Sequence, residues 1–318
     1  MPSSEVPPQA YPARFCPCCG RFVSGPFRPG PGGRPDASCP HCGSLERQRF
    51  LALLLATLQP TLPPIGTLLD IAPTVLVTPM LERLGAERRI RMDLGADPRM
   101  VDCYASLTDL PLPDDSVDFL MCYHVLEHIP DDRAAMRELA RVLAPGGLGL
   151  VQVPWRSDED TDEDPSASEE DRVRRFGQAD HVRWYGRDLE QRLVDCGLSV
   201  RRVTPRTVLG EATCELLRLN PAEAVWVIAA DQAPFLALGQ EDDTSSMVRL
   251  LDSLVGRLAA EREQRDRARA RVARLKSRVE RQRLRIEALE RSGRSALPGP
   301  VAVVRRGAGR LRRLSGRG

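Results

Sequence analysis

Two short cysteine motifs lie near the N-terminus, and each of them pairs two cysteines. They read Cys16-Pro-Cys-Cys19-Gly and Cys39-Pro-His-Cys42-Gly, with nineteen residues between them. Two such C-x-x-C pairs complete the tetrahedral four-sulfur shell that structural zinc prefers. Zinc would also supply the folding energy that a short, loop-rich segment lacks. We predict a zinc ribbon over residues 1–43 with Cys16, Cys19, Cys39 and Cys42 as ligands, and we weigh a redox pair or free thiols as alternatives.

Three of the four histidines fall in two segments whose residue types could bind a metal or move a proton. His124, Glu127 and His128 follow the spacing i, i+3 and i+4, which brings side chains to one face of a helix. His181 lies in a second polar segment, residues 176–186. Three hypotheses stay open. These four residues hold a divalent metal that lowers the pKa of a bound hydroxyl, or one histidine is an unassisted general base, or Glu127 and His128 only orient the loop and cap the helix.

The segment 176–186 also gathers amide, charged and aromatic side chains. We expect the following residues to face a substrate: Gln178, Asp180, His181, Arg183, Trp184 and Tyr185. Ordinary packing at a strand edge would explain the aromatic residues as well. Arg183 and Arg187 could pair with a phosphate or carboxylate of the substrate.

The composition supports one sizeable domain with accessory segments. The chain has 318 residues, a net charge of +2 and 42% hydrophobic residues. Its longest apolar run, residues 50–58, falls far short of the ~20 residues that a membrane helix needs. The first residues also lack the apolar stretch of a signal peptide. We therefore expect a cytoplasmic protein without a transmembrane segment.

Seven candidate strands alternate with helical segments between residues 44 and 231. The strands are expected at 67–72, 90–94, 101–105, 117–122, 148–153, 198–203 and 224–230. This alternation predicts an α/β domain with a Rossmann-like, doubly wound sheet, a right-handed crossover at each step and helices on both faces. Ligands of such sheets bind at the carboxyl ends of the strands. Residues 158–171 carry nine acids and no base, so we predict a mobile loop there.

The C-terminal third has a different pattern. After a linker at 232–246, ten of the thirteen a and d heptad positions between residues 247 and 289 are apolar. The pattern predicts a coiled coil over 247–292 that makes the chain a homo-oligomer. A solvated single helix is the alternative, because Glu261 and Arg265 interrupt the seam. The basic tail 293–318 is expected to be disordered and either to contact anionic polymers or lipid headgroups or only to aid solubility.

Acidic residues end two of the predicted strands. Asp70 lies in the segment TLLDIAPT, and Asp93 ends the segment IRMD. An acid at the end of the second strand is placed to bind ribose hydroxyls, in nicotinamide enzymes and in S-adenosylmethionine enzymes alike. Two later segments favour S-adenosylmethionine enzymes over nicotinamide enzymes. They are residues 106–132 and 138–154, which closely resemble the later motifs of class I S-adenosylmethionine-dependent methyltransferases. The resemblance covers about residues 65–230, and together with the cysteine motifs it looks like a bacterial subgroup with an N-terminal zinc ribbon.

The resemblance implies an S-adenosylmethionine site with these residues: Asp70, Ala72, Pro73, Asp93, Ser106, Leu107, Cys122 and His124. By this resemblance Asp70 would position the methionine end of the cofactor, and Ala72 and Pro73 would form the turn that covers it. Asp93 would bind the ribose. Ser106 and Leu107 would lie beside the adenine, and the last two residues would line the floor beneath the sulfonium.

Two departures from the family pattern bear on catalysis. The glycine-rich turn D-x-G-x-G is here Asp70-Ile-Ala72-Pro-Thr74, so the backbone adopts a positive φ less cheaply. Ser106 stands where the family places an acid, which weakens the adenine contact. The E-x-x-E-H motif of small-RNA 2′-O-methyltransferases and ubiquinone-pathway O-methyltransferases holds a divalent ion, and His124 replaces its first acid here.

The expected function is methyl transfer to a small-molecule or glycan-linked acceptor, with oxygen as the methylated atom. One alternative is a non-catalytic scaffold, which the missing glycines and the long heptad favour. The other is a nucleic-acid methyltransferase, which the zinc ribbon and the arginine tail favour. Nucleic acid is the less favoured partner, because the acidic segment 158–171 would repel a polyanion.

Overall fold

The protein is described from a computed structural model, which covers residues 14–95, 97–231, 267 and 270–284. The chain divides into two units, residues 1–259 and 260–318. Within the described ranges, no helix is both long enough and apolar enough to cross a membrane.

A seven-stranded sheet forms the centre of the first unit. Its spatial order is β10-β11-β7-β6-β3-β4-β5. The strands are β3 (Thr67–Ile71), β4 (Arg88–Asp93), β5 (Cys103–Tyr104), β6 (Val117–Tyr123), β7 (Leu143–Gln152), β10 (Ser199–Val203) and β11 (Val225–Ala229). Each overlaps one of the seven predicted segments, so the predicted strands are confirmed.

The direction of the strands locates the ligand edge. β3 pairs in parallel with β4 on one side and with β6 on the other, so the strand order reverses between β3 and β6. Ligands bind at the carboxyl ends of the strands at such a switch point. The expected crossover at every step is wrong for the last strand, because β11 is antiparallel to both β10 and β7. The connection through α6 (Pro205–Leu209) and α7 (Glu211–Leu217) returns the chain to the end of the sheet at which β10 finishes.

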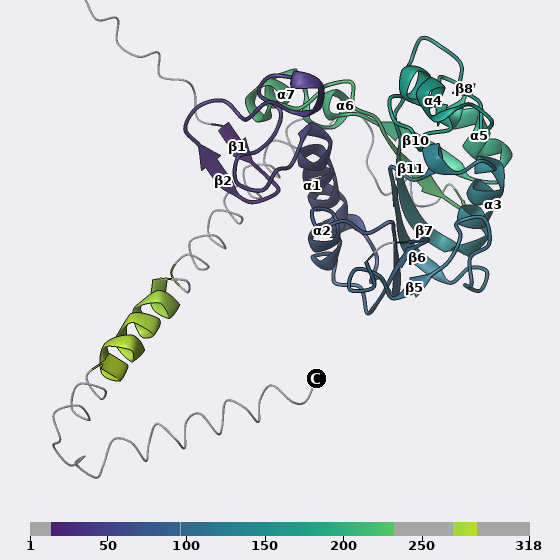
Figure 1. The fold of residues 1–318 in the computed structure, drawn as a ribbon. Coiled ribbons are helices and arrows are strands. Elements are labelled where there is room, and N and C mark those ends of the chain that lie inside the picture. The colour runs from purple at the N-terminus through teal and green to yellow at the C-terminus, as the bar shows by residue number, and fades with distance from the viewer. Residues whose placement is uncertain (1–13, 96, 232–266, 268–269, 285–318) are drawn as a thin grey trace, which may run out of the picture. The chain divides into compact units, whose positions relative to one another are not determined.

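Helices cover both faces of the sheet, as predicted (Figure 1). The helices α1 (Glu46–Leu58), α2 (Thr78–Glu82) and α7 pack on one face, and α3 (Asp132–Val142) and α5 (Leu189–Asp195) pack on the other. The helix α3 shows why these segments form. The Asp131 carboxylate accepts a hydrogen bond from the Ala134 amide and caps the first turn. One stripe of α3 is buried, and it consists of Ala135, Met136, Leu139 and Val142.

The cysteine segment packs against the sheet domain. It contains the hairpin β1 (Arg14–Cys16) and β2 (Arg21–Val23) and the short helix η1 (Pro31–Gly33). The fully buried Arg49 of α1 ties it in place. Its guanidinium donates to the carbonyls of Ala37 (2.7 Å), Ser44 (3.0 Å) and Arg218 (2.6 Å). We call residues 14–44 the cysteine module.

The acidic segment 158–171, predicted as a mobile loop, contains regular elements. The strand β8 (Asp162–Glu163) pairs with β9 (Arg183–Trp184), and α4 (Glu169–Phe176) begins at the Ser168 cap. Arg175 pairs with Asp162 at 2.5 Å and with Asp164 at 2.9 Å. The composition argument considered only burial, whereas arginines from outside the acidic segment neutralise part of its charge. Two short helices, η2 (Gln59–Thr61) and η3 (Leu126–His128), complete the elements of this unit.

The second unit contains a helix over residues 270–284. Val272, Leu275 and Val279 lie on it with 52%, 53% and 62% of their surface exposed. These residues occupy predicted a and d positions. Most of the predicted coiled coil 247–292, the linker 232–246 and the basic tail 293–318 lie outside the described residues.

Candidate active site

The turn after β3 has the shape that a glycine usually provides. Ala72 adopts a φ of 54°, and its amide donates to the Met92 carbonyl of β4 at 2.8 Å. The left-handed region costs a non-glycine residue roughly 1–2 kcal/mol. The altered sequence Ala72-Pro73 therefore keeps the bent turn at an energetic cost.

Asp70 lies beneath this turn rather than in an open crevice. Its side chain is 1% exposed and accepts a hydrogen bond from Thr78 Oγ1 at 2.8 Å. Burial raises the pKa of Asp70 to about 6. This hydrogen bond links the end of β3 to the start of α2, so Asp70 stabilises the turn between them.

The other cofactor residues suggested by the sequence lie along the same edge, with one exception. Asp93 ends β4, and its Oδ1 accepts from the Gly95 amide at 2.8 Å. Ser106 Oγ lies 2.7 Å from Thr108 Oγ1, and Leu107 is buried. Cys122 is the exception. Its side chain is fully buried in the apolar core, because side chains alternate along β6. Of the eight predicted cofactor residues, Ala72 and His124 line the cleft described next, and the other six do not.

A cleft of about 660 Å³ opens beside the turn, at the carboxyl ends of β3, β6 and β7. Ala72 and Thr74 line one end of it. Aromatic walls come from Trp155, Phe176 and Trp184. Its polar lining includes Tyr123, His124, Glu127, Gln152 and Glu223. The cleft therefore joins the turn after β3 to most of the predicted catalytic residues.

His124 and Glu127 form a hydrogen-bonded pair in this cleft. His124 has a φ of 58°, and its Nδ1 lies 2.9 Å from Glu127 Oε1. Glu127 is fully buried. His124 Nε2 and Glu127 Oε2 are buried and have no hydrogen-bond partner among the described residues. A carboxylate at Nδ1 fixes the tautomer of a histidine and leaves Nε2 as a proton acceptor.

Glu127, His128 and His181 bring one ligand atom each within 4.8 Å of one another. His181 Nδ1 donates to the Phe176 carbonyl at 3.0 Å, and His128 Nδ1 lies 3.2 Å from Asp180 Oδ2. Metal-binding histidines usually use one ring nitrogen for such an outer contact and the other for the metal. Three of the four residues suggested by the sequence thus converge. His124 is not one of the three converging residues, and its Nδ1 is instead paired with Glu127 Oε1.

Comparisons with known proteins agree with this architecture. A protein-family model described as "Methyltransferase domain" matches residues 69–151. These residues run from β3 to β7 and include the turn, the His124–Glu127 pair and the switch point. The chain carries a methyltransferase domain.

Relatives match the chain over short stretches. The Mycobacterium tuberculosis protein named "Probable S-adenosylmethionine-dependent methyltransferase Rv3030" is 46% identical over 59 residues, which are 19% of this chain and 22% of that protein. The 27-O-demethylrifamycin SV methyltransferase of Amycolatopsis mediterranei is 45% identical over 51 residues, 16% of this chain and 19% of that protein. The match thus spans about a fifth of the length of these relatives. Among solved structures, a chain from the complex between the Haloferax volcanii Trm112 methyltransferase activator and a methyltransferase is 20% identical, with 58% of this chain and 92% of that chain covered and a TM-score of 0.40.

Two arginines that the sequence suggested for substrate binding have structural roles in the methyltransferase domain. Arg183 is 1% exposed and donates to the carbonyls of Leu126 (2.8 Å), Ile129 and Pro130 (2.9 Å). Arg183 therefore stabilises the conformation of residues 126–130, the segment that contains Glu127. The exposed Arg187 pairs with Asp160 at 2.7 Å.

Tyr185 is likewise buried, and its hydroxyl donates to Asp132 Oδ2 at 2.8 Å. Gln178, His181 and Trp184 do line the cleft, whereas Arg183 and Tyr185 do not.

Sequence reasoning missed several residues of the cleft. Gln152 is almost fully buried at the end of β7, and its Nε2 donates to Glu223 Oε1 at 2.6 Å. A glutamine at the end of an apolar strand was the available signal. Glu223 and Arg47 come from segments that no motif marks, and only the fold brings them to the cleft.

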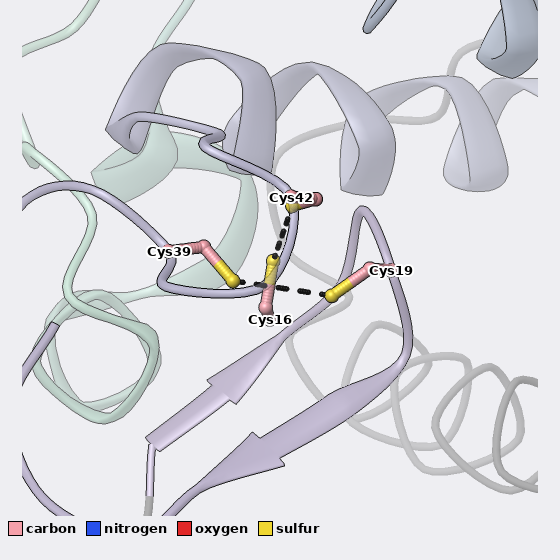
Figure 2. A group of neighbouring side chains, drawn as sticks. All are labelled: Cys16, Cys19, Cys39 and Cys42. Atoms are coloured by element: carbon pink, nitrogen blue, oxygen red, sulfur yellow. Dashed lines mark hydrogen bonds between the residues drawn. The ribbon is translucent and has the colours of Figure 1, made fainter.

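The four cysteines of the two motifs converge in the cysteine module. Figure 2 shows their side chains pointing toward one another, with Cys16 Sγ 3.7 Å from Cys42 Sγ and Cys19 Sγ 3.9 Å from Cys39 Sγ. A tetrahedron with zinc–sulfur bonds of about 2.3 Å has edges of about 3.8 Å, so the sulfur positions fit this ion. Each motif turns at its glycine as expected, because Gly20 and Gly43 have positive φ.

Proposed function

We propose that the chain is an S-adenosylmethionine-dependent O-methyltransferase that acts on a small-molecule or glycan-linked hydroxyl. The observation that carries the proposal is one continuous cleft that connects the strained Ala72 turn to His124 Nε2. S-adenosylmethionine supplies an activated methyl group on a sulfonium. The protein must then align the acceptor and remove its proton.

The chemistry assigns a role to each member of the pair. The acceptor oxygen forms a bond to the methyl carbon while the carbon–sulfur bond breaks, and the sulfur leaves as a neutral thioether. The hydroxyl proton moves to His124 Nε2. Glu127 Oε1 holds the opposite ring nitrogen and stabilises the imidazolium that forms. Trp155, Phe176 and Trp184 narrow the cleft and limit access of water.

A divalent metal at Glu127, His128 and His181 is a second component of the proposal. The three ligand atoms and their outer contacts support it. Such an ion would lower the pKa of an acceptor hydroxyl beside His124. His124 itself contributes no ligand in this arrangement.

We assign structural zinc to Cys16, Cys19, Cys39 and Cys42, on the fit of their sulfur atoms to a tetrahedron. The Cys19→Ser variant should lose one equivalent of zinc, as measured by elemental analysis. The matched variant Cys18→Ser, in the same motif but outside the cluster, should keep it. Equal zinc in both variants would refute the assignment. A reducing compartment such as the cytoplasm suits a reduced four-thiol site.

Calorimetry with S-adenosylhomocysteine on the full chain tests the central proposal. We expect dissociation constants in the micromolar range for the wild type. The Asp93→Ala variant should bind at least tenfold more weakly, whereas the exposed Asp109→Ala variant should bind like the wild type. No binding below millimolar concentration would favour the scaffold instead. Steeply salt-dependent binding of RNA or DNA would favour the nucleic-acid enzyme.

A further inference from the structure

The cysteine module and the start of α1 form one wall of the acceptor cleft. Pro31 and Arg34 lie between the two cysteine motifs, and Arg47 and Gln48 lie in the first turn of α1. All four line the same cleft as His124. The module therefore reaches the space where an acceptor would sit, in addition to any role in stability.

This wall carries positive charge that the protein neutralises only in part. Arg34 pairs with Glu46 at 3.2 Å and keeps 49% of its side chain exposed. Arg47 has no carboxylate within 4 Å among the described residues, and its Nε is buried without a hydrogen-bond partner. An arginine held in a cleft without a counter-ion is suited to bind a carboxylate or phosphate with two parallel hydrogen bonds.

Neither carboxylate of the cleft, Glu127 or Glu223, serves as the counter-ion of Arg47. Glu127 is engaged by His124. Glu223 accepts from Gln152, and burial raises its pKa while the charge of Arg47 acts in the opposite direction. Arg47 and Glu223 both line the cleft and do not form an ion pair with each other within the described ranges.

We propose that the acceptor is a hydroxylated compound with an anionic group, a phosphate or a carboxylate, that Arg47 and Arg34 bind. This proposal rests on the proposed function, because it names the class of acceptor for the same cleft. The aromatic walls suit the flat face of a ring. Tyr123 Oη and Gln152 Oε1 are buried and have no hydrogen-bond partner in the part of the chain that the structure describes, so they suit its hydroxyls. The anion is then recognised from the cysteine module, and the hydroxyl is directed toward the turn after β3.

The structure also explains what holds the two arginines in place. The two cysteine motifs lie on either side of the loop that carries Arg34, so zinc bound to the four cysteines would hold both ends of that loop. Arg49 fixes α1 beside that loop, through its hydrogen bonds to Ala37 and Ser44. The cluster thus positions the anion-binding wall.

Paired probes test the proposal on the full chain, saturated with S-adenosylhomocysteine and kept in its zinc-bound form. The pairs are glucose with glucose 6-phosphate and glucose with glucuronate, and calorimetry measures each dissociation constant. The wild type should bind at least one charged member tenfold or more tightly than glucose, and the two pairs distinguish phosphate from carboxylate. Arg47→Gln should reduce this preference to less than threefold, and Arg47→Lys should retain part of it. Arg174→Gln, at an exposed arginine of α4, should keep the full preference.

The outcomes separate this proposal from the proposed function. Failure of S-adenosylhomocysteine to bind the wild type would overturn both. Normal S-adenosylhomocysteine binding with no preference for the charged probes, or with no measurable binding of any probe, would overturn only the anionic acceptor. An unchanged preference in Arg47→Gln would also overturn it. S-adenosylhomocysteine binding by Arg47→Gln reports whether that variant is folded, and Arg34→Gln supplies a second variant if it is not.

Discussion

The Nδ1 atom of His124 lies 2.9 Å from Oε1 of Glu127, and the second polar atom of each side chain is buried without a hydrogen-bond partner in the described ranges. An unpartnered buried polar atom costs roughly 1–3 kcal/mol. The pair is therefore expected to gain partners when ligands enter the cleft. His124 Nε2 would gain the acceptor proton, and Glu127 Oε2 would gain a metal.

The metal content of variants distinguishes the role of His124 from that of Glu127. Glu127→Gln and His181→Ala should lose a second metal ion that the wild type retains after dialysis against Mn²⁺ or Zn²⁺, because each removes one ligand of the cluster. His124→Ala should keep this ion, because His124 is not among the three converging residues. Elemental analysis measures both quantities. A wild type with only the zinc of the four cysteines would end the metal hypothesis.

The strained turn predicts an unusual gain in stability. Ala72→Gly removes the cost of a positive φ but adds conformational entropy to the unfolded chain, so we expect a net increase of about 0.5–1 kcal/mol in the free energy of unfolding. Urea denaturation measures it. Ala140→Gly, the same change inside α3, should decrease stability by about 1 kcal/mol. Equal losses in both variants would contradict the geometry of the turn.

Asp70 predicts a pH dependence of stability. Its pKa rises from 3.8 to about 6 in the folded protein. Between about pH 4 and pH 6 the folded protein keeps a proton that the unfolded chain releases, so stability falls as the pH rises through this range and stays lower above it. The displacement corresponds to roughly 3 kcal/mol.

Denaturation of Asp70→Asn at pH 4.5 and pH 7.5 checks this dependence. Between pH 4.5 and pH 7.5, the free energy of unfolding of the variant should fall less than that of the wild type. At pH 7.5 the variant should be more stable than the wild type. Asp109→Asn, at an exposed aspartate, should follow the wild type. A slope in Asp70→Asn that equals the wild-type slope would show that this carboxyl does not titrate as described.

The helix at 270–284 predicts self-association. Leu275→Asp places a charge at an a position whose side chain is 53% exposed in the single chain, and it should lower the mass measured by light scattering. Leu284→Asp changes an equally exposed leucine outside the a and d positions and should leave the mass unchanged. If the wild type is monomeric, the solvated single helix is the correct alternative.

The sequence predicted the framework better than the cleft. Strand positions followed from apolar segments bounded by turn residues, and β3, β6 and the second half of β7 obey that rule because they are buried on both faces. The antiparallel direction of β11 could not be read, since a strand looks alike in either direction. Arg183 was misjudged because its residue type suits an anion as well as it suits the three carbonyls that it binds.

The residues of the cleft show the same limit. His124, Glu127 and His181 were visible because histidine is rare in this chain and two of them follow helical spacing. Arg47 and Glu223 were invisible, because they come from segments 176 residues apart that only the tertiary fold brings to one cavity. The signal for such residues is the absence of a local partner, which a sequence does not record.

The anchoring of Arg49 has a consequence for any attempt to shorten the protein. Its guanidinium donates to the carbonyl oxygens of Ala37 and Ser44 and to that of Arg218, far along the chain. Truncation before residue 44 would remove the Ala37 oxygen and the Phe27 ring that covers the cation. The remaining fragment would keep the Arg49 guanidinium, which is buried in the intact protein, without these partners. It would also expose the apolar side of α1. We therefore expect the smallest stable fragment to begin with the first cysteine motif.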